Sequence, residues 1–174
     1  MSDHNWMGGG SNRLPPEGFD AMRVCLNGHV ISAYADTRPQ FTSPFCDKCG
    51  ARTISVCQHC NMKIRGAYNS PGAYTLPPKI PPNNCHECGE AYPWRAERIA
   101  ALNEMIAESE RLSADEKAQM TVAVSDLSTD NPRTELGVSR FKRLAKAAGM
   151  GAKDANYKFA VDVASETAKK SLEG

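Results

Sequence analysis

Seven cysteines and one histidine form four pairs with short, regular spacing, and all of them lie between residues 25 and 88. The pairs are Cys25/His29, Cys46/Cys49, Cys57/Cys60 and Cys85/Cys88. Three pairs have the spacing C-x-x-C, and the first has the spacing C-x-x-x-H. Thiolate and imidazole are ligands that Zn²⁺ prefers, and a structural zinc site takes four of them. Eight ligands in four pairs therefore predict two structural zinc ions per chain.

The four ligand pairs can be divided between the two metal ions in two ways. Sequential pairing gives the sets Cys25, His29, Cys46, Cys49 and Cys57, Cys60, Cys85, Cys88, which make a tandem zinc ribbon. Cross-brace pairing, as in RING-type domains, would join the first pair to the third. Such modules need nearly adjacent middle pairs, whereas residues 50–56 separate Cys49 from Cys57 and have the pattern of a strand. The spacing therefore favours sequential pairing.

The other histidines are expected to take no part in metal binding. His29 completes a set that otherwise has three ligands, whereas His59 and His86 lie between the cysteines of their own pairs and His4 lies near the N-terminus. Two alternatives for the cysteines are unligated buried thiols and a redox-active pair. Three repeats of C-x-x-C argue against the first, and the lack of a single pair at a helix start in a βαβ context argues against the second.

Composition divides the chain into three parts. Residues 1–20 are rich in glycine and proline and are expected to form a flexible tail. Residues 21–94 hold every cysteine and contain strand-like runs at 30–34, 52–56 and 64–68. Residues 95–174 are rich in alanine, glutamate and lysine and are expected to form three or four helices. We therefore predict an α+β protein, with a small zinc-stabilised β module followed by a helical bundle.

Several local signals place the helices. Apolar residues recur at helical spacing from Ile99 to Ile106, and the capping box that starts at Ser113 predicts a second helix. Asn131 and Pro132 predict the start of a third helix, and a fourth is expected to run to the C-terminus. Ala160, Ala164 and Ala168 recur every four residues in this last helix. Such a row suits either intramolecular packing or a homo-oligomer formed through the C-terminal helices.

Charge gives little support for nucleic-acid binding. The chain carries 21 basic and 20 acidic residues, and residues 21–95 carry eight and four. Two zinc sites with seven thiolates would leave the module close to neutral, whereas a surface that follows phosphates needs a denser basic stripe. A small patch of Arg52, Lys63 and Arg65 with Tyr68 and Tyr74 keeps nucleic-acid binding open as an alternative.

The ordered motifs resemble a bacterial family of uncharacterised zinc-ribbon proteins, known only as a domain of unknown function. The matching pieces are CLNGHVI at 25–31, FCDKCG at 45–50, CQHC at 57–60, KIRG at 63–66, CHECG at 85–89 and YPW at 92–94. The segment from Leu112 to Leu144 is also similar to the region that follows the zinc module in that family. The resemblance implies a bacterial cytoplasmic protein with two zinc sites, and it implies no activity.

The sequence predicts a zinc-binding, non-enzymatic adaptor or scaffold that binds a protein partner. We find no nucleophile–base pair, phosphate-binding loop or paired carboxylates, and eight ligands for two metals leave no open coordination position. Nucleic-acid binding is the alternative, and an enzyme whose site forms only in an assembly is a third hypothesis. The chain shows no signal peptide and no run of about 18 apolar residues, and we expect it in the cytoplasm, where thiols stay reduced.

Overall fold

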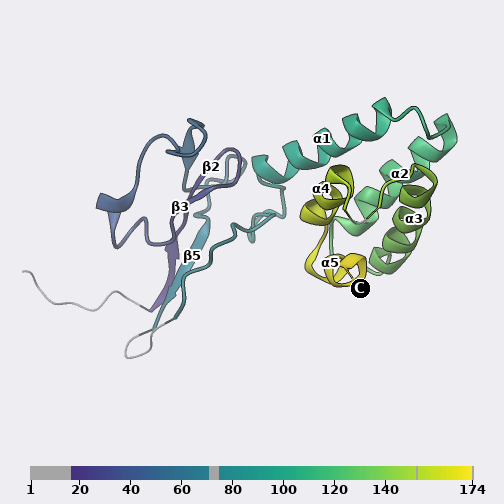
Figure 1. The fold of residues 1–174 in the computed structure, drawn as a ribbon. Coiled ribbons are helices and arrows are strands. Elements are labelled where there is room, and N and C mark those ends of the chain that lie inside the picture. The colour runs from purple at the N-terminus through teal and green to yellow at the C-terminus, as the bar shows by residue number, and fades with distance from the viewer. Residues whose placement is uncertain (1–16, 71–74, 152, 174) are drawn as a thin grey trace, which may run out of the picture. The chain divides into compact units, whose positions relative to one another are not determined.

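The computed structural model describes residues 17–70, 75–151 and 153–173, which fall into two compact units. The first unit, Met1–Glu90, contains all the cysteines and is called the ribbon unit below. The second, Ala91–Gly174, is called the helical unit and is drawn in green and yellow in Figure 1. The division falls between Glu90 and Ala91, whereas composition placed it at residue 94.

The ribbon unit is built from two small antiparallel sheets (Figure 1). In one sheet β1 pairs with β5, and in the other β2 lies between β3 and β4. The strands are β1 (Gly18–Ala21), β2 (Arg23–Cys25), β3 (Val30–Ser32), β4 (Thr53–Ile54) and β5 (Arg65–Asn69). Three of them lie within the predicted runs or overlap them, but β1 and β2 were not predicted. The tail expected over residues 1–20 therefore ends earlier, because β1 begins at Gly18; residues 1–16 of that tail lie outside the described residues.

Polar and backbone contacts hold the ribbon unit together where its apolar core is small. Its large, fully buried aliphatic side chains are Met22, Val24 and Ile64. The buried carboxylate of Asp20 accepts hydrogen bonds from the backbone N–H groups of Asp36 (2.8 Å) and Thr37 (3.3 Å). A unit of this size with so few large buried side chains needs an additional source of stability, which metal sites can supply.

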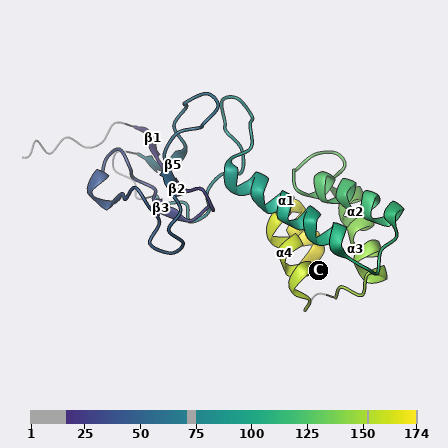
Figure 2. The same cartoon turned by 90° about the horizontal axis from the view of Figure 1, so that it is seen from above.

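The described part of the helical unit contains five helices, which Figure 2 shows from above. They enclose one apolar core. They are α1 (Pro93–Glu108), α2 (Ala114–Leu127), α3 (Thr134–Ala147), α4 (Ala155–Val163) and α5 (Glu166–Glu173). All five helices contribute to this core, with Leu102, Leu127, Phe141, Tyr157 and Leu172 among the contributors. The helical unit therefore has a larger apolar core than the ribbon unit.

Local signals located the helix starts with mixed success. The capping box is present: Ser113 accepts a hydrogen bond from the Glu116 N–H, and the Glu116 side chain accepts one from the Ser113 N–H. The third helix begins at Thr134 rather than at Pro132, because Asn131 forms a turn in which its side chain accepts a hydrogen bond from the Arg133 N–H (2.7 Å).

The predicted fourth helix is two helices, so the described residues contain five helices rather than three or four. The break falls at Ala164, which has an extended backbone, and the N–H of the next residue, Ser165, donates to the Leu127 carbonyl (2.9 Å). Ala160, Ala164 and Ala168 therefore do not form a row on one helix, and all three are buried in the core of the unit. These three alanines are therefore not available to a second chain, and a homo-oligomer formed through the C-terminal helices stays a prediction.

The predicted fold class is confirmed. Small antiparallel sheets come first in the chain and five helices follow, which makes an α+β protein with the cysteine clusters of zinc ribbons. Within the described residues, every helix is too short or too polar to span a bilayer.

Candidate metal centres

The eight predicted ligands lie in two groups of four in the ribbon unit. Cys25, His29, Cys46 and Cys49 form the first group, called site one, and Cys57, Cys60, Cys85 and Cys88 form the second, called site two. Within each group the candidate ligand atoms all lie within 4.8 Å of one another. These are the sets that sequential pairing predicts, and the cross-brace alternative does not describe the structure.

The distances in site one match the edges of a tetrahedron around zinc. Bonds of about 2.3 Å to sulfur and 2.0–2.1 Å to nitrogen place two sulfurs about 3.8 Å apart and a sulfur and a nitrogen about 3.6 Å apart. The sulfurs of Cys25 and Cys49 are separated by 3.8 Å. The His29 Nδ1 atom lies 3.5 Å from the Cys25 sulfur and 3.6 Å from the Cys46 sulfur. Site one therefore fits a Cys₃His zinc site with Nδ1 as the histidine ligand.

Site two has the geometry of a Cys₄ zinc site. Its sulfurs are 3.8 Å apart between Cys57 and Cys88 and 3.6 Å apart between Cys60 and Cys85. A disulfide would bring two sulfurs to about 2.05 Å, and all seven cysteines are free. Both groups thus fit zinc, as the sequence predicted.

The same tight turn presents each C-x-x-C pair. In each turn the N–H of the first cysteine donates to the carbonyl five residues later, and the N–H four residues after that cysteine donates back to its carbonyl. The residue after the second cysteine has a positive φ, with values of 70° at Gly50, 60° at Asn61 and 76° at Gly89. The two glycines were anticipated for this conformation, whereas Asn61 was missed, although asparagine is the residue besides glycine that adopts it most readily.

A different turn presents the first pair. The Cys25 N–H donates to the His29 carbonyl (3.0 Å), and the Gly28 N–H donates to the Cys25 carbonyl (2.9 Å). Gly28 has a φ of 87°, which a residue with a side chain rarely adopts. Cys25 itself ends β2, so the sheet positions one ligand and this turn positions the other.

Backbone N–H groups stabilise the thiolate form of two ligands. A hydrogen bond from the Ala51 N–H lowers the pKa of Cys49 to about 6. Hydrogen bonds from the N–H groups of Cys88 and Glu87 lower the pKa of Cys85 to about 6. In addition, the side-chain amide of Asn27 lies 3.4 Å from the Cys49 sulfur. Because zinc binds the thiolate and not the thiol, these donors favour the metal-binding form at neutral pH.

Two of the remaining histidines lie outside the two groups. His59 and His86 are exposed and do not belong to either set of ligands. His4 lies outside the described residues. Exposure of the two central histidines agrees with the expectation that they point away from the metals.

Protein purified without added metal is expected to contain two zinc ions per chain, because the eight ligands divide into two complete sets of four. Elemental analysis by mass spectrometry, combined with a count of thiols that react under native conditions, checks this number. A single zinc ion per chain together with four reactive thiols would contradict the assignment of two sites.

Comparison with known proteins places the chain in a family. Searches of curated proteins and of solved structures found no match. A family model matches residues 18–172, a range that includes both metal groups and all five helices apart from the last residue of α5. The chain therefore belongs to the family described as "uncharacterized protein conserved in bacteria (DUF2321)".

Proposed function

We propose that this protein is a non-enzymatic, cytoplasmic adaptor whose zinc-held loops bind a protein partner. The observation that carries the proposal is the distribution of exposed apolar side chains. Of the ten exposed large hydrophobic side chains in the described residues, eight belong to the ribbon unit, namely Phe19, Phe41, Phe45, Val56, Met62, Tyr68, Leu76 and Ile80. Exposed apolar groups concentrated in one part of a protein are typical of interaction surfaces.

Two phenylalanines near site one are the strongest candidates for contact residues. Phe41 is 62% exposed and Phe45 is 61% exposed. Phe45 directly precedes the ligand Cys46 and pairs with Arg52 across the turn, so zinc binding holds its backbone in place. Phe41 ends a short 3₁₀ turn that begins at Pro39. A rigidly held aromatic ring loses little conformational entropy on binding, which suits it to anchor a partner.

The metal sites support a structural role for zinc. A catalytic zinc ion keeps one coordination position for water or substrate, whereas each group here offers four protein ligands. In this proposal the metals hold the loops in shape, and binding is the task of the side chains between the ligands.

Contacts within the chain engage much of the patch that suggested nucleic-acid binding. The Lys63 ammonium pairs with Asp36 (2.8 Å), and the Arg65 guanidinium lies over the Phe19 ring, 4.9 Å from its centre. The Tyr68 hydroxyl donates to Glu17 (3.0 Å). Tyr74 lies outside the described residues. These intramolecular partners make the adaptor role the better-supported proposal.

The test compares proteins captured by the zinc-loaded chain with those captured by a Phe41→Ser, Phe45→Ser double variant. Both side chains are exposed, so the variant is expected to keep two zinc ions and its circular dichroism spectrum while it loses at least one captured protein. Quantitative mass spectrometry of cross-linked complexes from the source bacterium measures the loss. Ala107→Ser, an exposed apolar-to-polar change in the helical unit, is the control. An unchanged set of captured proteins would contradict a role for these two rings.

A further inference from the structure

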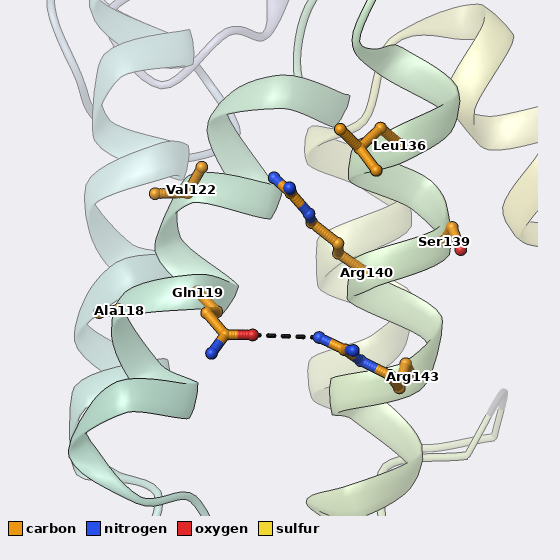
Figure 3. A pocket seen from close by; sticks show the side chains of 7 residues that line it. All are labelled: Ala118, Gln119, Val122, Leu136, Ser139, Arg140 and Arg143. Carbon is orange, nitrogen blue, oxygen red and sulfur yellow. Dashed lines mark hydrogen bonds between the residues drawn. The ribbon is translucent and has the colours of Figure 1, made fainter.

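A groove runs between α2 and α3 on the surface of the helical unit. It has a volume of about 590 Å³ and is lined by Ala118, Gln119, Val122, Leu136, Ser139, Arg140 and Arg143. Figure 3 shows that Arg140 and Arg143 extend from α3 toward α2 and that Gln119 faces Arg143. The size is within the range that accommodates side chains of a bound peptide.

The apolar part of the groove is unusual for this unit. Val122 is 47% exposed and Leu136 is 43% exposed. Among the described residues of the helical unit, these are the two large hydrophobic side chains that are exposed, and both line the same groove. Two isolated aliphatic groups on a surface need no explanation, but these two line one groove from different helices and offer apolar contacts to a partner that lies in it.

The charged part of the groove is positive. Arg143 donates to the uncharged amide oxygen of Gln119 (3.0 Å), and among the described residues no carboxylate oxygen lies within 4.0 Å of its guanidinium. Arg140 makes one loose ion pair, 3.7 Å from Asp126. Asp126 is itself held more closely by Arg133 (2.9 Å). The lining residues thus contribute two cations and no anion.

The acidic side chains closest in sequence to the lining residues are largely engaged elsewhere. Glu116 closes the capping box with Ser113, where hydrogen bonds from the Ser113 N–H and hydroxyl lower the pKa of its carboxyl, and the positive charge of Arg143 lowers this pKa further. Glu135 accepts a hydrogen bond from the Ser171 hydroxyl (3.1 Å). Asp115 is exposed and lies one turn before Gln119 on α2, outside the lining. Glu116 attracts Arg143 without forming an ion pair with it, and Arg140 makes only the long ion pair with Asp126, so both guanidinium groups can still pair with a carboxylate of a partner.

The walls of the groove are held by close packing of the two helices. A Cβ atom added at Gly137 of α3 would lie 2.8 Å from the Asp126 Cβ and 2.9 Å from the Leu127 backbone nitrogen. Such distances are possible only because the residue is glycine, so the two backbones lie very close together there. A groove formed between tightly packed helices exists before the partner binds, which reduces the entropic cost of binding.

We propose that this groove binds an acidic amphipathic helix of a protein partner, with aliphatic side chains in contact with Val122 and Leu136 and carboxylates paired with Arg143 and Arg140. Charge complementarity selects this occupant: a basic helix would be repelled, and an apolar helix would cover both guanidinium groups without offering them a carboxylate. A nucleic-acid backbone could pair with the arginines, but it has no aliphatic side chain to contact Val122 and Leu136. This inference rests on the proposed adaptor function, and it names the class of partner that the helical unit would bind.

The experiment selects binders from a phage-displayed library of helical peptides of about 16 residues, using the zinc-loaded full chain as target. The selected peptides are expected to be rich in Asp and Glu and to carry Leu, Ile or Met at spacings of three and four. Fluorescence anisotropy with a labelled selected peptide should show affinity about tenfold or more weaker for Arg143→Glu and for Leu136→Gln. Lys142→Glu makes the same charge change on α3 at an exposed residue outside the groove and should change affinity less than about threefold.

Several results would overturn the proposal. Basic or neutral selected peptides, equal loss of affinity in Arg143→Glu and Lys142→Glu, or failure to select any peptide that binds the wild-type chain better than Arg143→Glu would each do so. Binding of a single-stranded oligonucleotide through Arg143, in place of peptides, would also overturn it. A dimer of this chain that Arg143→Glu dissociates would do the same. The Phe41→Ser, Phe45→Ser variant leaves the groove unchanged. Loss of partner capture in that variant therefore reports on the ribbon unit, whereas loss of peptide binding in the groove variants reports on the helical unit.

Discussion

Removal of zinc from the full chain is expected to unfold the ribbon unit while most of the helical circular dichroism signal remains. Structural zinc contributes on the order of 10 kcal/mol per site to the folding of small modules. The ribbon unit has few large buried side chains to replace that contribution, whereas all five helices share an apolar core of their own. Metal removal therefore has the largest effect that we predict for this protein.

Two measurements separate the units in that experiment. After treatment with a strong chelator, the ellipticity at 222 nm should change little, and heating should still give a cooperative transition for the helices. Amide hydrogen exchange should show loss of protection in β1–β5 and retained protection in α1–α5. Added zinc should restore the ribbon signals. Complete loss of helix on chelation would contradict the independence of the helical unit.

Replacement of His29 by alanine is expected to speed zinc release from site one by more than about 100-fold. Loss of an outer partner of a metal ligand alone costs about 10- to 100-fold in affinity, and loss of a ligand should cost more. Site two contains no histidine, so it should keep its metal. A colorimetric chelator that reports zinc transfer with time measures the two sites as separate phases.

Matched variants make this prediction specific. His59→Ala and His86→Ala remove exposed imidazoles next to cysteine ligands and should leave both release phases unchanged. His29→Cys should retain two zinc ions, because thiolate is an equally good ligand. Since Nδ1 is the His29 atom that faces the sulfurs, the proton should reside on Nε2. Long-range proton–nitrogen NMR spectra can identify that tautomer, and equal zinc release from all three alanine variants would remove His29 from the site.

The metal sites could be predicted from the sequence because zinc ligation depends on local spacing. A C-x-x-C turn leaves few conformations that place two sulfurs on one ion, so the motif specifies its own geometry. The capping box at Ser113 is local in the same sense, and α2 begins where it predicts. Which nitrogen of His29 faces the metal site depends on the orientation of the ring relative to Cys25 and Cys46. The sequence carries no signal for that orientation.

The elements that were missed depend on partners far away in the chain. Strand β1 has no strong pattern of its own and exists through its pairing with β5. The break between α4 and α5 has neither glycine nor proline to mark it. Ser165 does carry a signal, because its hydroxyl accepts a hydrogen bond from the Ala168 N–H (3.3 Å) as a capping residue would. Its bond to the Leu127 carbonyl, which accompanies the break, is a tertiary contact.

The pairing of Gly18 with Asn69 affects how the protein folds during its synthesis on the ribosome. All four ligands of site one emerge before any residue of β5, so the nascent chain can bind its first zinc ion while β1 still lacks its partner strand. Pairings between distant residues form slowly, and an unpaired strand edge invites contact with other chains. In a cell short of zinc, β5 would emerge without a metal at site two, whose two pairs of ligands flank it in the sequence, and its pairing with β1 would be less stable. We expect such cells to accumulate this protein in aggregates and to clear it by proteolysis.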